Sequence, residues 1–379
     1  MAIPSDPHMA HGAAPAGPPA AIGTPAERLE TPAVTVDLAV LERNLGKMQA
    51  YCDAHRLAFR PHVKTHKIPA IARMQRAAGA QGIVCQKLSE AEVFADAGFD
   101  DVFIPYNLVG EAKTARLVRL ARRIRVSAAV DSLPAAQGIS AAAQAGGVTV
   151  PLLVECDTGG ARAGVQSPQE AVELAGTLAH LPGVRFEGLM TFPTDPERTP
   201  RFLAAALDLL GQAGLEARIV SGGGTPQSWT AHRVPQLTEH RAGTYVYNDH
   251  NTLAAGTCTL DEVSLRVHAT VVSRPTAARA ILDSGSKTLS SDLHRDSARG
   301  QGRSYGLIEA YPDAVIAALS EEHAVVQLRE GGKQPQIGER VTVVPNHCCV
   351  VSNLHDWIYG VRDGRVEQVW RVAARGTVQ

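Results

Sequence analysis

Short apolar runs of strand-like sequence alternate with longer stretches of helical periodicity between residues 31 and about 250. Eight such units in roughly 210 residues predict a parallel sheet whose strands are joined by helical crossovers. The number of units favours a closed (β/α)8 barrel, the TIM barrel, over an open sheet, because such barrels typically contain ~250 residues. The predicted strands are 33–36, 57–60, 82–85, 101–104, 124–128, 149–155, 184–189 and 217–220, and the predicted helices include 38–55, 110–121, 168–179 and 201–213.

The sequence on either side of this region has a different character. Residues 1–30 are rich in Ala, Pro and Gly, so we expect a poorly ordered arm with little apolar surface to offset the entropy of ordering. After residue 250, short β-like runs are separated by Gly, Pro and charged turns. We therefore predict the α/β fold class, with a barrel at 31–250 followed by a smaller β-rich domain at 251–379.

Global properties restrict the partners. The 379 residues include 45% hydrophobic residues and carry a formal net charge of −1, which gives no reason to expect nucleic acid or an anionic membrane as a partner. No apolar run is long enough to span a bilayer, and no basic region followed by an apolar stretch marks a secretory signal. Six scattered cysteines do not make a disulfide scaffold, so we expect reduced thiols and a cytoplasmic location.

The segment Arg60-Pro-His-Val-Lys-Thr-His-Lys67 concentrates basic side chains around Lys64, just after a predicted strand. A lysine amine forms a Schiff base readily when neighbouring cations or burial lower its pKa. His62 and His66 are neighbours of this kind. Taken alone, the segment is also typical of a basic turn that contacts solvent or an acidic partner.

A glycine triplet, in the run Ser221, Gly222, Gly223, Gly224 and Thr225, follows the predicted strand that would be the eighth of the barrel. Three glycines let the backbone approach a ligand and can direct several N–H groups one way, which makes an anion nest. Loops after the last barrel strands are a common phosphate site. Lys64 and such a nest together suit pyridoxal 5′-phosphate, which needs both. A flexible turn is the alternative interpretation of the triplet.

His347 and Cys349 lie two residues apart in a segment predicted to be extended, so their side chains would point to the same side. Such a pair can ligate a borderline-soft divalent ion such as zinc, and water or substrate would complete the open coordination of a catalytic site. The alternative is a buried histidine beside two ordinary core cysteines.

Three further loop residues would lie at the same end of the barrel. Gln86 follows the third predicted strand, Arg162 follows the sixth, and Tyr245 lies where the barrel region ends. The planar guanidinium of Arg162 suits either the cofactor ring or a substrate carboxylate, and Tyr245 is a candidate to hold the cofactor or relay a proton. In loops, residues of these types are more often structural.

Together these motifs resemble the metal-dependent D-threonine aldolase and D-serine dehydratase family, pyridoxal phosphate enzymes that share a barrel of the alanine-racemase type. The matching segments, in family order, are 60–64, 85–91, 160–164, 221–225, 243–245, 281–287, 322–323 and 347–356. The resemblance implies that Lys64 is the Schiff-base lysine and that residues 221–225 cradle the phosphate. It implies His347 and Cys349 as ligands of a divalent metal (zinc, manganese or magnesium), a D-3-hydroxy amino acid as the small-molecule substrate, and a homodimer.

The leading hypothesis is retro-aldol cleavage to glycine and an aldehyde, as in D-threonine aldolase. The alternative is a D-serine or 3-hydroxyaspartate type of dehydratase that releases ammonia and a 2-oxo acid; a racemase and a non-catalytic cofactor-holding protein are further alternatives. Two features depart from the aldolases as a group. Position 349 is Cys instead of Asp, and Phe192-Pro193 stands in place of a Tyr-His pair. Asp195 and His62 are the candidates to replace the missing base.

Overall fold

The computed structural model describes residues 17–296 and 302–379. Residues 1–16 of the predicted arm lie outside the described residues. The following part of the arm is attached to the rest of the chain, because the N–H of Gly23 donates to the carbonyl of Val366 at 2.7 Å and the N–H of Ala26 donates to that of Gly364 at 2.8 Å.

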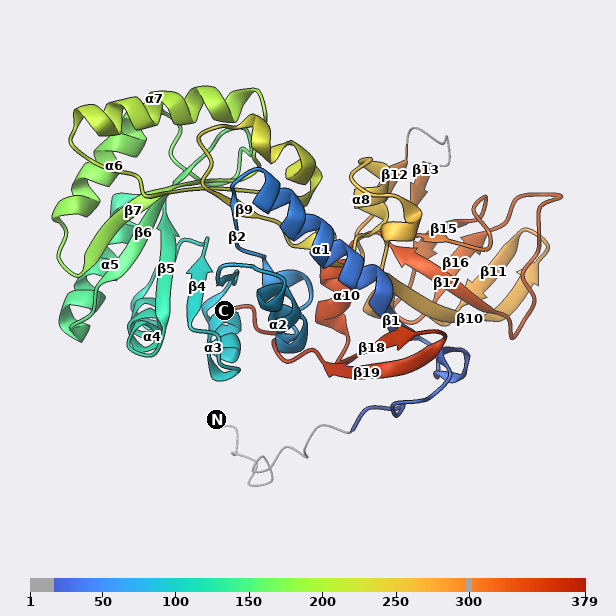
Figure 1. Cartoon of the computed structure of the whole chain (residues 1–379). Helices are drawn as coiled ribbons and strands as arrows, with labels where there is room; N and C mark the ends of the chain where they lie inside the picture. Colours follow the sequence, from blue (N-terminus) through green and yellow to red (C-terminus); the bar gives the residue numbers. More distant parts are fainter. Residues whose placement is uncertain (1–16, 297–301) are drawn as a thin grey trace, which may run out of the picture.

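Eight parallel strands form the barrel, with helices packed around its outside (Figure 1). Seven strand pairs are direct neighbours, and the first and second strands close the ring through the bonds from Gln81 N–H to Phe59 O (2.7 Å) and from Val84 N–H to Pro61 O (2.8 Å). The strands are β2 (Ala58–Phe59), β3 (Ile83–Val84), β4 (Asp101–Ile104), β5 (Arg125–Val130), β6 (Val150–Cys156), β7 (Val184–Thr191), β8 (Ile219–Gly223) and β9 (Glu239–Arg241). The prediction of a closed (β/α)8 barrel is confirmed.

One predicted barrel strand belongs elsewhere. Residues Ala33–Asp37 form β1, which pairs antiparallel with β10 (Leu265–Thr276) and parallel with β18 (Trp357–Arg362) of the second sheet. The eighth barrel strand is β9, whose sequence Glu-His-Arg has no apolar pattern to predict it. Consequently, Lys64 follows the first barrel strand instead of the second, and the glycine triplet follows the seventh instead of the eighth.

The crossover helices begin and end where local sequence signals favour it. The Asp37 carboxylate accepts the N–H of Val40 at the start of α1, and the Ser167 hydroxyl accepts the N–H of Glu170 at the start of α6, which also has Pro at its first position. Gly147 ends α5 with a left-handed φ of 65°. The helices of the barrel region are α1 (Leu38–Ala54), α2 (Pro69–Ala77), α3 (Leu88–Asp96), α4 (Glu111–Ala121), α5 (Leu133–Gly146), α6 (Pro168–His180) and α7 (Arg198–Gln212).

The second sheet is mainly antiparallel and includes strands from both ends of the described chain. Its order is β15-β16-β11-β10-β1-β18-β19, and β17 pairs with both β10 and β14. The short helices α8 (His250–Ala254), α9 (Ser286–Leu289) and α10 (Cys348–Leu354) accompany it. The other strands of this sheet are β11 (Arg279–Leu282), β14 (Gly306–Ile308), β15 (Val315–Leu319), β16 (Ala324–Gln327), β17 (Arg340–Pro345) and β19 (Arg365–Arg371), while β12 (His294–Asp296) and β13 (Gly302–Ser304) form a separate pair.

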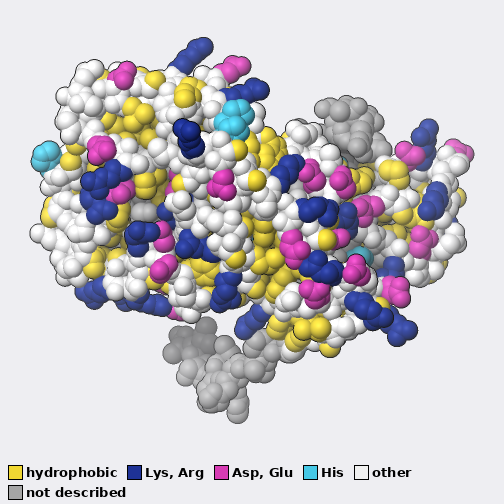
Figure 2. Space-filling model, viewed as in Figure 1, with side chains coloured by type: hydrophobic (Ala, Val, Ile, Leu, Met, Phe, Trp, Pro, Cys, Tyr) yellow, Lys and Arg dark blue, Asp and Glu magenta, His cyan; other side chains and the backbone are white. Residues whose placement is uncertain are grey.

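The surface carries mixed charge. On the face drawn in Figure 2, Lys and Arg side chains are interspersed with Asp and Glu over both the barrel and the second sheet. This mixture fits the formal net charge of −1 and differs from the basic stripe of a nucleic-acid-binding face. Of the helices in residues 17–296 and 302–379, none has the length and apolar character to cross a membrane.

Candidate active site

A cavity of about 260 Å³ lies at the carboxyl ends of the barrel strands, where α10 of the second sheet reaches the barrel. This is the end of a (β/α)8 barrel where catalytic groups gather. The cavity brings together most of the residues singled out in the sequence. From the barrel these are His62, Lys64, Gln86, Arg162, Gly223, Gly224 and Thr225, and from the second sheet they are His347 and Cys349.

Lys64 projects from the 3-10 turn η2 (Val63–Thr65), which directly follows β2. Its Nζ donates to Oε1 of Gln86 at 3.3 Å. Burial lowers the pKa of the Lys64 amine, while the negative charges of Cys349 and Glu90 act in the opposite direction. A buried amine with a lowered pKa is neutral in a larger fraction of molecules, and the neutral amine is the nucleophile that attacks an aldehyde.

His62 is half-buried beside Lys64, and Gln86 holds its ring. The Nε2 of His62 lies 3.0 Å from Oε1 of Gln86, so Nε2 carries the proton and Nδ1 is left as an acceptor. Within the described residues, Nδ1 is buried and has no hydrogen-bond partner. Burial, followed by the positive charge of Lys64, lowers the His62 pKa well below its ordinary value. The ring is therefore neutral, with one unused nitrogen.

The glycine triplet ends β8, but its N–H groups are not all available to a ligand. The N–H of Gly223 donates to Oγ1 of Thr194 at 2.7 Å, and the N–H of Gly224 donates to the carbonyl of Arg241 at 2.9 Å. Gly224 has a φ of 122°, which favours glycine. Thr225 begins the 3-10 helix η3 (Thr225–Arg233), where the first N–H groups have no partner within the helix. The free donors for an anion therefore start at Thr225.

Ser221 and the missed residue Arg241 form a buried ionic layer behind the cavity. The guanidinium of Arg241 donates to Oγ of Ser221 and, at 2.8 Å, to the carbonyl of Thr191, and Ser221 in turn donates to Glu239. Burial lowers the pKa of Arg241 to about 10. Ser221 and Gly222 are buried and do not line the cavity, whereas Arg241 does. In the sequence, only the closeness of Arg241 to the segment Gly243–Tyr245 could have indicated that it belongs to the site.

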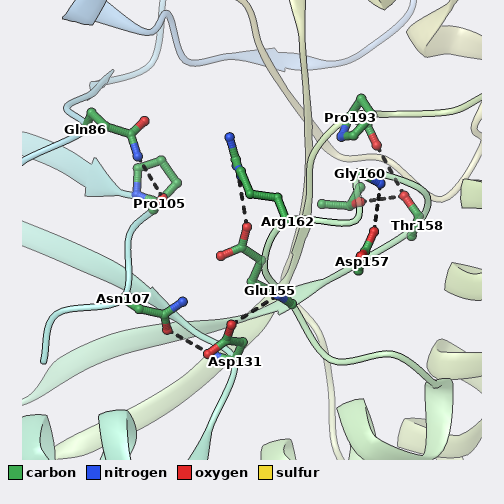
Figure 3. A network of polar contacts seen from close by, with 12 residues as sticks. Gln86, Pro105, Asn107, Asp131, Glu155, Asp157, Thr158, Gly160, Arg162 and Pro193 are labelled. Carbon is green, nitrogen blue, oxygen red and sulfur yellow. Dashed lines mark hydrogen bonds and ion pairs between the residues drawn. The ribbon is translucent and has the colours of Figure 1, made fainter.

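Arg162 lies on the loop after β6 and faces the cavity. Figure 3 shows its guanidinium directed at the Glu155 carboxylate, and the closest atoms are 3.8 Å apart. The guanidinium also lies over the ring of Phe192, 4.7 Å from its centroid. Oδ1 of Asp157 shapes the loop by accepting the N–H groups of Gly159, Gly160 and Ala161. Because Arg162 remains 57% exposed and only loosely paired, it can still bind an anionic group of a ligand.

Tyr245 is placed outside the cavity. Its hydroxyl accepts a hydrogen bond from Nε2 of Gln75 at 2.9 Å, and burial raises its pKa above the ordinary value. Its ring packs edge-on against Phe59 in the core. The structure therefore gives Tyr245 a structural position, and Thr244 next to it lines the cavity instead.

His347 and Cys349 do meet at the cavity, although the predicted extended geometry is wrong. His347 caps α10, and Cys349 lies in its first turn. The neighbouring Cys349, followed by Asp292, raises the pKa of His347 to about 9 against the effect of burial. Interactions with Cys348 and then with His347 hold the pKa of Cys349 well below its ordinary value, against the effect of burial. The carboxylate of Asp292 bonds to Nδ1 of His347, so Nε2 is the nitrogen left for a ligand.

These two side chains provide part of a coordination sphere. A thiolate and an imidazole suit a borderline-soft divalent ion. Across residues 17–296 and 302–379, no group of three or more His, Cys, Asp and Glu is arranged to hold a metal. The pair alone therefore supplies two protein ligands, one fewer than the three of a typical catalytic zinc site.

Asp195, one of the two candidate bases, does not line the cavity. Its Oδ1 accepts the N–H groups of Glu197 and Arg198, both at 2.8 Å, at the start of α7. These bonds, with that from Arg198 the larger, lower the pKa of the Asp195 carboxyl. Asp195 is thus used by the helix terminus, and His62 is the candidate that faces the cavity.

The sequence matches two family models along its length. Residues 36–251 match the alanine racemase N-terminal domain, and residues 264–361 match a serine dehydratase domain. The chain is 37% identical over 375 residues to a D-threonine aldolase of an Arthrobacter species, covering 95% of this chain and 96% of that protein. It is 32% identical over 380 residues to a 3-hydroxy-D-aspartate aldolase of Paracoccus denitrificans, covering 94% and 95%.

Solved structures give the same relationship. A D-threonine aldolase from Filomicrobium marinum superposes with a TM-score of 0.83 at 34% identity, covering 96% of this chain and all of that one. A D-threo-3-hydroxyaspartate dehydratase from Delftia sp. HT23 also superposes with a TM-score of 0.83, at 32% identity, covering 92% and 98%. The chain therefore belongs to the D-threonine aldolase and D-serine dehydratase family of lyases, with the fold of alanine racemase.

Proposed function

We propose that this protein is a pyridoxal-phosphate- and divalent-metal-dependent lyase that cleaves D-3-hydroxy amino acids between Cα and Cβ, giving glycine and an aldehyde. One observation carries the proposal: a single cavity in one chain is lined by Lys64 from the barrel and by His347 and Cys349 from the second sheet. The 37% identity to a D-threonine aldolase supports cleavage as the reaction.

The cavity fits pyridoxal phosphate in three respects. Lys64 offers a half-buried amine of lowered pKa, Arg162 and Arg241 supply positive charge, and His62 has a buried nitrogen without a partner among the described residues. Lys64 would hold the cofactor covalently, and Thr225, directly after the glycine triplet, would donate to its phosphate. When bound, the cofactor would supply an electron sink for negative charge that develops at the substrate Cα.

The remaining chemistry is assigned to side chains of this chain. In retro-aldol cleavage a proton leaves the 3-hydroxyl as the Cα–Cβ bond breaks, and a proton is later added at Cα. Nδ1 of neutral His62 is proposed to accept the hydroxyl proton, because His62 lines the cavity and its Nδ1 is an unpaired acceptor among the described residues, whereas Asp195 does not line the cavity. The Lys64 amine is proposed to move the proton at Cα. The exposed guanidinium of Arg162 would orient an anionic group.

His347 and Cys349 would hold the divalent metal, which we propose to be zinc, manganese or magnesium. Bound near the 3-hydroxyl, such an ion would lower the pKa of that hydroxyl. Asp292 would keep the His347 ring in one orientation through its bond to Nδ1.

Dehydration is the second candidate function. Cys349 at the second metal position and Phe192-Pro193 in place of a Tyr-His pair favour it, and the chain is 34% identical over 351 residues to a D-threo-3-hydroxyaspartate dehydratase of Delftia sp.. A racemase would not need the metal pair, and a non-catalytic cofactor holder would need neither the metal pair nor the second sheet.

The proposal also covers the roles of the two domains, the cellular location and the oligomeric state. We assign cofactor binding to residues 31–250 and the metal ligands to residues 251–379, with β1 as the segment that crosses this division. A cytoplasmic location is supported by the free thiols of all six cysteines. We further propose a homodimer, with each cavity built from one chain.

The test is to incubate the purified protein with pyridoxal phosphate, a divalent metal and D-threonine, and to identify the products. Glycine and acetaldehyde are expected. 2-Oxobutanoate with ammonia would instead establish the dehydratase. Cys349→Asp is the matched variant: it should shift the ratio of cleavage to elimination, and an unchanged ratio would mean that this ligand does not steer the reaction.

A further inference from the structure

Lys67 closes the turn that carries Lys64, and its position is unusual for a lysine. It has a left-handed φ of 56° and is only 8% exposed. A residue with a Cβ adopts this conformation at a cost in free energy, and burying an ammonium costs more unless it is paired. The backbone is held on both sides, because its N–H donates to Val63 O at 2.8 Å and its carbonyl accepts the N–H of Ala374 at 3.1 Å. Many contacts thus maintain an unfavourable conformation, which is typical of functional sites.

The ammonium of Lys67 joins the turn to α10 and to the C-terminal residues. Nζ donates to Oδ1 of Asn353 at 3.0 Å and to the carbonyl of Thr377 at 3.4 Å. Asn353 lies in the last turn of α10, and the same Oδ1 accepts the N–H of Gly376 at 3.0 Å. Lys67 therefore connects α10 and the C-terminal residues to the barrel through hydrogen bonds.

The other end of α10 is attached to the same turn. Sγ of Cys349 lies 3.3 Å from Oγ1 of Thr65, the residue that follows Lys64. Cys349 and Asn353 are four residues apart, about one helical turn, so α10 contacts the segment Thr65–Lys67 at both of its ends. The helix that begins at the candidate metal ligands is thereby held against the turn that carries the candidate cofactor lysine.

A buried carboxylate extends this connection to Lys64 itself. Oε1 of Glu90 lies 4.0 Å from Nζ of Lys67, and its Oε2 accepts the N–H of Gln86 at 2.6 Å. The side-chain oxygen of Gln86 in turn accepts from Lys64. Glu90 is 1% exposed, and burial raises the pKa of its carboxyl, while the positive charge of Lys67 acts in the opposite direction.

We propose that Lys67 is a positioning residue that holds Lys64 at a fixed separation from His347 and Cys349. The inference rests on the proposed function, in which Lys64 carries the cofactor and the other two side chains carry the metal. Lys64 belongs to the barrel, whereas His347 and Cys349 belong to the second domain. A bond across the domain boundary would therefore keep the distance between cofactor and metal constant. The Lys67–Asn353 hydrogen bond spans this boundary.

The test uses the holoenzyme loaded with Mn²⁺ and compares Lys67→Met, which removes the charge but keeps most of the stem, with Lys67→Arg, which keeps the charge. The paramagnetic relaxation of the cofactor phosphorus, measured by ³¹P NMR, reports the distance from the metal to the cofactor and does not depend on turnover. Steady-state kcat and KM are measured on the same samples. Lys287→Met is the matched control, because Lys287 pairs with Glu321 and Glu322 on the surface of the second domain.

We expect Lys67→Met to change the ³¹P relaxation rate per bound Mn²⁺ and to lower kcat by about 10- to 100-fold with little change in KM, since a small misplacement of reacting groups has effects of this size. Lys67→Arg should recover most of both, and Lys287→Met should match the wild type. Asn353→Leu removes the acceptor from the other side and should reproduce Lys67→Met, which keeps the test valid if one variant does not fold.

The proposal is overturned if Lys67→Met has the same ³¹P relaxation rate and the same kcat per loaded site as the wild type. A change in thermal stability alone does not alter this conclusion. A wild-type protein whose phosphorus resonance does not respond to Mn²⁺ would contradict the metal placement in the proposed function, and the role of Lys67 with it. A wild type that gains no visible absorbance with pyridoxal phosphate would instead contradict the assignment of Lys64.

Discussion

Oε1 of Gln86 lies 3.3 Å from Nζ of Lys64, and the same oxygen lies 3.0 Å from Nε2 of His62. An amide oxygen only accepts hydrogen bonds, so both nitrogens are donors toward it. Gln86 therefore determines which nitrogen of His62 remains an acceptor, and it directs the Lys64 amine into the same cavity.

Lys64→Ala should abolish the visible absorbance that appears when pyridoxal phosphate becomes attached to the protein, because no other lysine lines the cavity among the described residues. Burial lowers the Lys64 pKa, so attachment in the wild type should reach its maximal rate at a pH below 10.5, the ordinary lysine value. Absorbance spectra at a series of pH values measure both. Lys47→Ala, which removes an amine paired with Glu262 outside the cavity, is the control; a retained band in Lys64→Ala would exclude Lys64.

Asp195→Ala should leave kcat within about twofold of wild type and lower the free energy of unfolding by about 0.5–2 kcal/mol, because the N–H groups of the turn that leads into α7 lose their acceptor. The reason is that Asp195 accepts the N–H groups of Glu197 and Arg198 instead of facing the cavity. Asp195→Asn keeps an acceptor and should retain most of the stability. Kinetics combined with urea unfolding separate the two effects, and a large loss of kcat in Asp195→Asn would restore this residue as the base.

Phe192→Leu should lower kcat/KM by about two- to fivefold, because it removes the aromatic face beneath the Arg162 guanidinium, and such contacts contribute about 0.5–1 kcal/mol at exposed sites. The guanidinium lies 4.7 Å from the ring centroid, and Phe192 is 38% exposed. Phe192→Tyr keeps the ring and should retain activity. Equal kcat/KM values for the leucine and tyrosine variants would show that the stacking does not orient Arg162.

Acid should destabilise the protein through buried histidines. Burial lowers the pKa of His240 to about 3 and of His66 to about 4. Both rings stay neutral in the folded protein, whereas the unfolded chain binds protons near pH ~6.5. The free energy of unfolding should therefore fall as pH drops from ~6.5 toward 4, by about 1.4 kcal/mol per pH unit for each histidine.

His240→Leu tests this contribution directly. Neither ring nitrogen of His240 has a hydrogen-bond partner within the described residues, so the substitution leaves no polar group unpaired. Urea unfolding at several pH values between 6 and 4.5 should show a slope smaller by about 1.4 kcal/mol per pH unit than that of wild type. The same slope in both proteins would mean that His240 is protonated in the folded state.

The sequence predicted the barrel because most of its strands are apolar runs between helical segments. It misplaced β1 because an apolar strand gives no indication of which sheet it will join. It missed β9 because Glu239–Arg241 is polar, and these residues are buried only through tertiary contacts such as the pairing of Glu239 with Arg60 at 2.7 Å. Local pattern carries no information about such pairing.

For the candidate site, the sequence predicted most of the residues that meet at the cavity but not how each of them reaches it. Lys64, Gln86, Arg162, His347 and Cys349 converge on one cavity, as their positions after strands or beside them suggested. The direction of individual side chains was not predictable. Tyr245 points to Gln75 in the core, and Cys349 reaches the cavity from a helix. These orientations depend on the packing of α10 and the 3-10 turns against the barrel.

The position of β1 has a consequence for how the protein is made. This strand leaves the ribosome before the barrel, but its partners β10 and β18 are synthesised after the barrel. The barrel can form while β1 still has no partner strand. The unpaired backbone groups of such a strand are a template for aggregation. Nascent chains that stall before residue 265 should therefore depend on chaperones, and the catalytic cavity, which needs α10, is assembled last during biosynthesis.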